Sequence, residues 1–192
     1  MNKQIKWITR TALLLALALL FQSLRGSIPK VMIPGLGEMD QYIIGSLVNT
    51  TLILAAVTVG FTGGLVIAIV TPLVALLQGE IAFPIMMPFV ALGNVAIVLF
   101  VSLFYKRNKI LAFGSGIIAK FLTLLVTINL IVIPYLTPTL PTEKAGVVSA
   151  MLSFKFGYPQ LITATLGAII AYALIPVLES SFRESYSYQS KK

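Results

Sequence analysis

The chain has 192 residues, of which 58% are hydrophobic and only 10% are charged, and its formal net charge is +8 at pH 7. Soluble domains average roughly 25% charged residues, so this composition excludes an ordinary soluble domain and indicates a helical membrane protein. Cysteine and histidine are absent, which excludes a disulfide framework, a thiol nucleophile and a histidine-based metal site, and we predict no metal site.

Six long apolar stretches follow one another along the chain. Each approaches or exceeds the ~17–20 residues that a helix needs to cross the hydrocarbon core of a bilayer. We therefore predict an all-α, polytopic membrane protein in which residues 1–192 form a single six-helix transmembrane domain. The predicted spans are 8–24, 42–60, 63–79, 83–105, 110–134 and 158–178, and a cytoplasmic tail at 179–192 follows them.

Glycine, proline and basic residues separate these spans. The run Pro-Gly-Leu-Gly at 34–37 breaks the chain before the second span, the segment 60–64 marks the turn before the third, and the basic run 106–109 separates the fourth from the fifth. The two longest connections are residues 25–41 and 135–157, and we expect both to be irregular segments that could form a lid.

Prolines mark further breaks in the apolar pattern. The end of the fifth span is predicted at Pro134, Pro138 and Pro141. Kinks inside the third and fourth spans are predicted at Pro72, Pro84 and Pro88.

Basic residues predict the orientation of the bundle in the membrane. Four fall on one side, namely Arg25, Lys30, Lys144 and Lys155. Nine fall on the side that holds both termini, namely Lys3, Lys6, Arg10, Lys106, Arg107, Lys109, Arg183, Lys191 and Lys192. By the positive-inside rule we expect a multi-pass protein of the cell membrane with cytoplasmic N- and C-termini.

None of the six acidic residues falls inside a predicted span, whereas Lys120 lies deep within the fifth. Carriers driven by protons or sodium usually have an intramembrane carboxylate, and an ATPase of the common type has a G-x-x-x-x-G-K-[ST] phosphate loop, which this chain lacks. Proteolysis within the membrane would need histidine or paired aspartates. The chain is therefore not expected to be an enzyme. Uphill transport would need an energy source outside this chain.

An unpaired cation inside a membrane is a functional-site hypothesis. Amides and hydroxyls near the outer ends of the spans should face the bundle, because lipid offers them no partner. The predicted substrate-binding residues are Asn49, Gln78, Glu80, Asn94, Lys120, Asn129, Tyr158 and Gln160. The alternative is that these side chains bond only to neighbouring helices, with Lys120 in an interhelical groove or against a partner protein.

Ala12 and Ala16 lie one turn apart in the first span, a spacing that lets another helix approach closely. Packing within the chain is the alternative interpretation. Comparable pairs occur at Gly60/Gly64, Ala164/Ala168 and Gly167/Ala171.

With these features the chain resembles the substrate-binding S components of energy-coupling factor (ECF) vitamin transporters. The resemblance covers essentially the whole chain. It rests on the length, the six helices, both termini inside, the Ala12–Ala16 pattern, the long outer connection after the first span, and the stretches GSLVN at 45–49, TPLVALLQG at 71–79 and PFVALGN at 88–94.

The resemblance implies a membrane subunit that captures a vitamin or related micronutrient in a cavity near the outer surface. It implies that Ala12 and Ala16 meet a membrane coupling subunit, which is joined to two ATPase subunits. ATP is then used by those partners, and this chain holds no cofactor. Two other functions remain open from the residues alone, a self-sufficient secondary transporter or channel and a non-transporting assembly subunit. The sequence does not name the vitamin.

Overall fold

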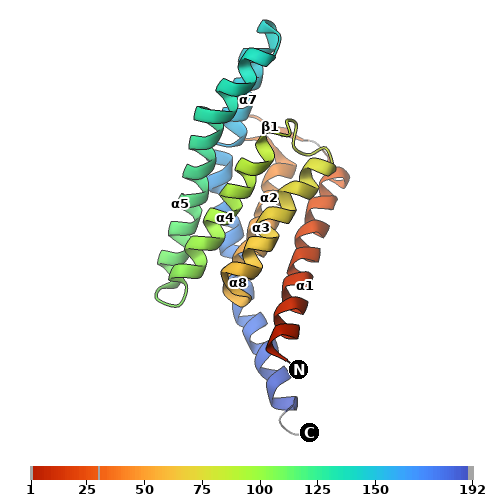
Figure 1. The fold of residues 1–192 in the computed structure, drawn as a ribbon, viewed down its shortest axis with the longest axis vertical. Helices are drawn as coiled ribbons and strands as arrows, with labels where there is room; N and C mark the ends of the chain where they lie inside the picture. The colour runs from red at the N-terminus through yellow and green to blue at the C-terminus, as the bar shows by residue number, and fades with distance from the viewer. Residues whose placement is uncertain (1, 30, 190–192) are drawn as a thin grey trace.

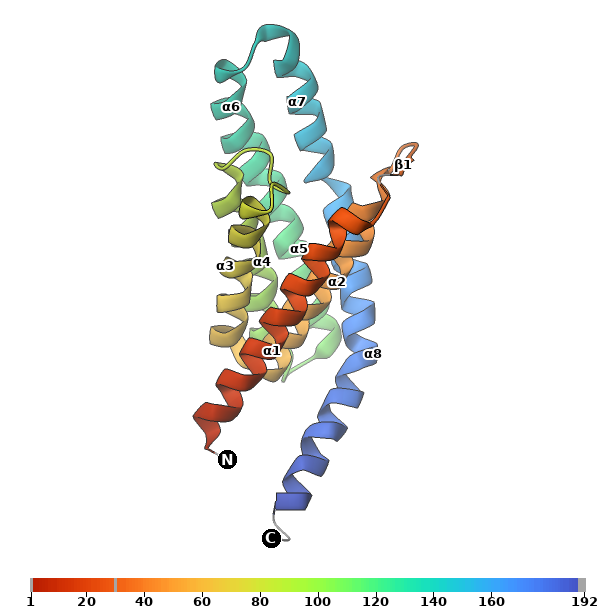
Figure 2. The same ribbon diagram turned by 90° about the vertical axis from the view of Figure 1, so that its right-hand side faces the viewer.

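Figure 1 and Figure 2 show the computed structural model as a bundle of long helices. The structure describes residues 2–29 and 31–189. Lys30, Lys191 and Lys192, which entered the predicted charge balance, lie outside the described residues. Both ends of the described chain lie at the same end of the bundle (Figures 1 and 2), as an even number of spans requires.

The helical elements in chain order are α1 (Lys3–Ser23), the 3-10 turn η1 (Leu24–Ser27), α2 (Met39–Thr58), α3 (Gly60–Leu77), α4 (Met86–Phe104), α5 (Lys109–Thr127), the π-helical turn η2 (Ile128–Val132), α6 (Ile133–Leu136), the 3-10 turn η3 (Thr137–Thr139), α7 (Thr142–Lys155) and α8 (Tyr158–Gln189). Among the described residues, six helical stretches are long and apolar enough to cross a membrane. The predicted all-α, polytopic class is confirmed.

The connection between α1 and α2 contains a short hairpin. Strands β1 (Met32–Ile33) and β2 (Gly37–Glu38) pair antiparallel. Gly35 and Gly37 have φ of +74° and +87°, a region that glycine adopts at little cost, so the predicted break at 34–37 is confirmed as a tight turn. Helix α2 starts three residues before the predicted span, and Asp40 therefore lies in its first turn.

The turn before α3 is shorter than predicted. Val59 alone separates α2 from α3, and Gly60, with φ of +78°, is the first residue of α3. Gly63 and Gly64 lie inside the helix, where a Cβ atom on Gly64 would approach Cγ1 of Val98 to 2.5 Å. These two glycines allow α3 to pack closely on its neighbours, and their assignment to a turn was wrong.

Only one of the three prolines at which kinks were predicted lies in a helix interior. Pro72 lies inside α3, whereas Pro84 precedes α4 and Pro88 lies in its first turn. Proline is tolerated in a first turn because the N–H that it lacks has no intrahelical partner there. The prediction of kinks at Pro84 and Pro88 was therefore wrong.

The fifth span does not end at Pro134. The π-helical turn η2 leads directly into α6, so Pro134 lies within a continuous helical path that starts at Lys109. Proline lacks the backbone N–H, so one hydrogen bond is missing there, but the helix continues. The helical path reaches Thr139. The connection 135–157, predicted to be irregular, contains α7, a helix of 14 residues that returns toward the bundle (Figure 2). At the other end, α8 continues past residue 178 to Gln189 instead of ending where the tail was predicted.

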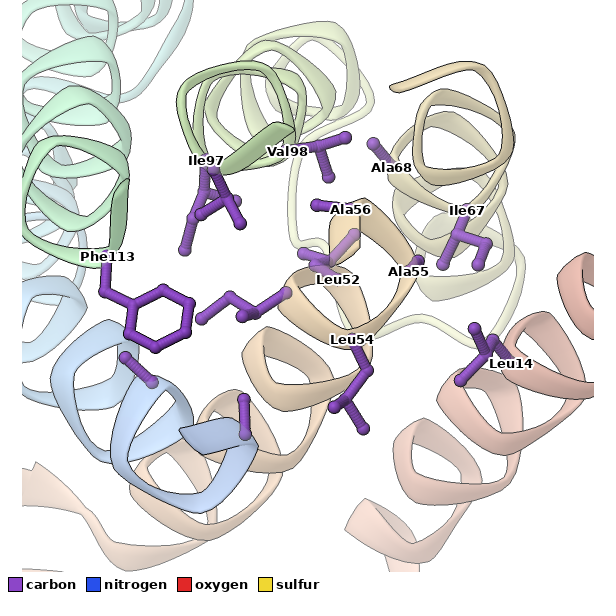
Figure 3. Close-up of a cluster of buried hydrophobic side chains, with 14 of the residues drawn as sticks. Leu14, Leu52, Leu54, Ala55, Ala56, Ile67, Ala68, Ile97, Val98 and Phe113 are labelled. Carbon is purple, nitrogen blue, oxygen red and sulfur yellow. The ribbon is translucent and has the colours of Figure 1, made fainter. Parts of the chain in front are cut away.

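The hydrophobic core is centred on α2, which contacts α1, α3, α4 and α8. Figure 3 shows Leu52, Ala55 and Ala56 of α2 surrounded by side chains of the other spans. A second buried cluster joins α4, the extended α5 and α7 near the opposite end of the bundle from the termini, and its members include Met86, Leu124 and Leu152. Polar side chains gather between these two apolar regions.

Candidate functional site

A cavity of about 140 Å³ lies between the helices in the half of the bundle away from the termini. Its walls come from α1, α2, α3, α4, α5 and the junction of α7 with α8. The polar and charged residues that line it are Gln22, Arg25, Gln41, Asn49, Thr71, Glu80, Asn94, Lys120, Lys155, Gln160 and Thr163.

Lys120 forms the floor of this cavity, and only 5% of its surface is exposed. Its ammonium group donates a hydrogen bond of 2.6 Å to Oδ1 of Asn49 and one of 2.7 Å to Oδ1 of Asn94. Among the described residues no carboxylate lies within 4.0 Å of this ammonium. An ammonium has three N–H donors, so two neutral acceptors hold the group and leave both its charge and one donor for a ligand.

Asn94 and Asn49 are themselves held in place. The Nδ2 group of Asn94 donates to Oγ1 of Thr71 at 3.3 Å, and Nδ2 of Asn49 donates to Oγ1 of Thr163 at 3.4 Å. Each amide therefore offers its oxygen to Lys120 because its nitrogen is engaged on the other side. This arrangement ties α2, α3, α4, α5 and α8 together around one cation.

Glycines permit the close helix contacts that bring these groups together. A Cβ atom on Gly93 would approach Cγ of Leu124 to 2.7 Å, and one on Gly167 would approach Cβ of Asn49 to 2.6 Å. Glycine at 93 lets α4 approach α5 beside Asn94, and glycine at 167 lets α8 approach α2 beside Asn49. The floor of the cavity thus depends on two positions without side chains.

The mouth of the cavity is bridged by a cluster of charges. Nη1 of Arg25 lies 3.1 Å from Oε2 of Glu80, and Nε of Arg25 lies 3.5 Å from Oδ2 of Asp40. Asp40 is buried, and its first-turn position in α2 favours a negative charge. Arg25 therefore connects the end of α1 to α2 and to the segment after α3, across the opening.

The β1–β2 hairpin reaches over the start of α8. The hydroxyl of Tyr158 donates to the carbonyl oxygen of Gly35, and the ring of Phe154 packs edge to face on Tyr158. A Cβ atom on Gly37 would approach this Phe154 ring to 2.8 Å. Nζ of Lys155 lies 3.9 Å from Oε2 of Glu38. Glu38 at the end of the hairpin thus lies beside Lys155, which lines the cavity.

Five of the eight predicted site residues line the cavity: Asn49, Glu80, Asn94, Lys120 and Gln160. The other three lie outside the cavity. Gln78 accepts a bond from Gln22 and donates to Ser23, Tyr158 contacts the hairpin, and Asn129 bonds to Ser153 of α7 and to the carbonyl of Leu125.

Sequence reasoning did not select Arg25, Gln41 and Lys155, which also line the cavity. All three lie outside the predicted spans. Gln22 and Thr71 also line the cavity and were not predicted, although both lie inside predicted spans. A usable signal was present, because Arg25 and Lys155 are two of the four basic residues predicted on the outer side.

Ala12 and Ala16 are exposed on the outside of α1. The residues of α1 that face the bundle are Thr11, Leu14, Ala18 and Gln22. Within the described residues, the two alanines are therefore free of the intramolecular packing that was the alternative interpretation of their spacing.

Comparison with known proteins gives one match. Residues 6–179 match the family described as "ECF transporter, substrate-specific component". No curated protein and no solved structure matches the chain.

Proposed function

The chain belongs to the substrate-specific components of ECF transporters, and from this premise we propose that it captures a small anionic micronutrient in the cavity above Lys120. Members of this family are binding subunits for transport and not enzymes, and partner ATPases hydrolyse the ATP. Membership also decides against a self-sufficient carrier and against a subunit that binds no solute. We propose, in addition, the chemical class of the substrate, the residues that bind it and the surface that meets the partners.

The charge of Lys120 is the observation that carries the proposal. Placing an ammonium near the bilayer centre costs roughly 2.5–3.5 kcal/mol on insertion scales, and only two amide oxygens offset that cost here. The other two cations of the cavity have acidic neighbours, since Arg25 lies beside Glu80 and Lys155 lies near Glu38. Lys120 is thus the group that gains most from an anionic ligand.

The volume bounds the size of the ligand. About 140 Å³ is close to the roughly 150 Å³ that holds a single benzene ring. A carboxylate-bearing molecule of about one ring fits the cavity as it stands. A larger micronutrient would enter only after the Arg25 cluster and the β1–β2 hairpin move apart.

The orientation follows from the charge balance along the chain. The predicted balance of nine basic residues on the side of the termini against four on the other side supports cytoplasmic termini by the positive-inside rule. The cavity lies in the opposite half of the bundle. Substrate would enter from outside the cell, close to the hairpin.

The coupling surface is assigned to the outer face of α1. Ala12 and Ala16 are exposed and one turn apart, so a partner helix can approach the α1 backbone closely there. We assign the coupling subunit of the ECF module to this face and expect two ATPase subunits to be joined to that partner.

Binding measurements on a variant of Lys120 and on a variant of its neighbour Asn94 test the site. Small molecules that co-purify with the chain are first identified by mass spectrometry, and their affinity is then measured on the isolated subunit. Lys120→Met should weaken binding by about tenfold or more, the scale of a lost charge-assisted hydrogen bond. Asn94→Asp keeps the lysine but supplies an internal carboxylate, so it should weaken an anion by a similar factor.

Lys144→Met serves as the matched control, because Lys144 lies exposed on α7 away from the cavity. Wild-type affinity in both the Lys120 and Asn94 variants would remove the lysine from the site. Normal ligand binding by Lys120→Met with lost assembly would place Lys120 at a partner interface instead.

A further inference from the structure

A second cavity, of about 480 Å³, lies at the end of the bundle that holds the termini. It is formed where α2 ends, α3 begins and α4 ends. Val57, Phe61, Leu99 and Leu103 give it an apolar lining. Leu103 is 61% exposed, so the cavity opens on the outer surface of the bundle, which faces lipid in a membrane protein.

Basic residues lie at one end of this cavity and in the connection that follows it. Lys106 belongs to its lining and is exposed, and Arg107 and Lys109 follow in the α4–α5 connection. Among the described residues no carboxylate lies within 4.0 Å of these three side chains. Tyr105 also lines the cavity, and Nζ of Lys109 lies 5.5 Å from the centre of its ring.

The depth of these groups corresponds to a lipid headgroup. Helix α4 has 19 residues, which at 1.5 Å per residue span about 28 Å, close to the thickness of the hydrocarbon core. Lys106 and Arg107, just beyond its end, therefore lie at the level of phosphate groups, while Leu99 and Leu103 lie at the level of the acyl chains.

We propose that this cavity binds an anionic phospholipid. One acyl chain lies along the apolar lining, and the phosphate accepts a hydrogen bond from Lys106. Basic pockets between transmembrane helices favour anionic headgroups in this way. A protein helix about 10 Å wide fills roughly 420 Å³ per turn, so the cavity of about 480 Å³ would admit little more than one turn. A narrow acyl chain fits the space better.

The site is separate from the substrate cavity and does not depend on which micronutrient is bound. The test therefore uses lipids only. The purified chain is equilibrated with equal amounts of phosphatidylglycerol and phosphatidylcholine that carry the same acyl chains, and the retained lipids are counted by native mass spectrometry.

We expect phosphatidylglycerol to be retained preferentially. Lys106→Gln should lower that retention about fivefold, the effect of one basic residue at an anionic surface, while the matched change Lys144→Gln on α7 should leave it unaltered. Val57→Phe, which fills the apolar part, should reduce retention of both lipids.

Equal retention of the two lipids by the unaltered chain, or undiminished phosphatidylglycerol in Lys106→Gln, would overturn the proposal. So would a Lys106→Gln variant that keeps its lipid but no longer co-purifies with the ECF module, because that result would make the cavity a protein interface. Lys106 is exposed, so its substitution leaves the fold intact and the measurement interpretable.

Discussion

Helices α8 and α1 both carry small residues one turn apart, but the surroundings of the two sets differ. On α8, Ala164, Ala168 and Ala171 are buried, and Gly167 lies so close to α2 that a Cβ atom would meet the backbone oxygen of Ser46 at 2.8 Å. The small residues of α8 therefore hold the bundle together. They also position Asn49, and through it Lys120.

On α1 the same spacing faces outward. Ala12 and Ala16 are exposed, while the opposite face of the helix is buried. The same spacing therefore occurs in buried packing on α8 and on an exposed face of α1, where we propose that the coupling subunit binds. Burial distinguishes the two, and sequence spacing alone does not. Larger side chains on α8 should accordingly lower the stability of the fold. Larger side chains on α1 should lower transport and leave the fold intact.

The largest effect is expected at Gly167. Gly167→Ala forces a Cβ atom against Asn49 and the α2 backbone, and overpacking of this kind costs about 1–3 kcal/mol, occasionally more. The thermal midpoint in detergent should fall, and substrate affinity should fall with it because Asn49 is displaced. Gly114→Ala is the matched control, since nothing lies within 4 Å of its added Cβ, and it should stabilise α5 by up to about 1 kcal/mol. Equal thermal midpoints for the two variants would refute the packing role.

A loss of transport without a loss of binding is expected on α1. Ala12→Trp and Ala16→Trp should each lower uptake by about tenfold or more, because a bulky side chain prevents close approach of a partner helix. Affinity of the isolated subunit should stay unchanged, because both residues lie outside the cavity. Leu13→Trp enlarges an exposed side chain of the same helix and serves as the control in uptake assays. Full uptake in both alanine variants would move the coupling surface elsewhere.

The sequence predicted the six spans well, because a continuous apolar stretch of about 17–20 residues has the length and polarity of a helix that crosses the bilayer. It failed at α7, which we expected to be an irregular connection. Three prolines near residues 134–141 suggested that helix formation stops there. The helical path instead continues through Pro134 after the π-helical turn η2, and Pro141 stands at the start of α7. The return helix from Thr142 to Lys155 was hidden by its modest hydrophobicity and its charged ends.

The part of the candidate site that could be predicted consists of polar side chains inside apolar spans. Lys120, Asn49 and Asn94 stood out because polar groups in lipid need partners, and the structure brings these three side chains into contact. Arg25 and Lys155 were missed, because charged residues beyond the span ends are ordinary at a membrane surface. Only tertiary structure shows that they turn back over the cavity.

A smaller effect, on backbone hydrogen exchange, is expected in the connection that follows α1. Substrate should order the connection 25–41, because Glu38 and Gln41 of this segment contact Lys155, which lines the cavity. Hydrogen exchange of amides in residues 31–41 should slow several-fold with ligand, while exchange around Ala12 and Ala16 should not change. Identical exchange of the hairpin with and without ligand would count against a lid.

The smallest effect is expected at Thr11, the neighbour of Ala12 on the inner face of α1. Its hydroxyl is buried and has no hydrogen-bond partner among the described residues. Thr11→Val replaces that hydroxyl with a methyl group of similar size, which removes an unmet desolvation cost of about 1–3 kcal/mol at most. Thermal stability in detergent should stay the same or rise slightly, and uptake should match the unaltered chain. A clear loss of uptake with normal stability would show that the hydroxyl finds a partner in the assembled transporter, and the coupling surface would then extend from Ala12 around α1 to the side that faces α3.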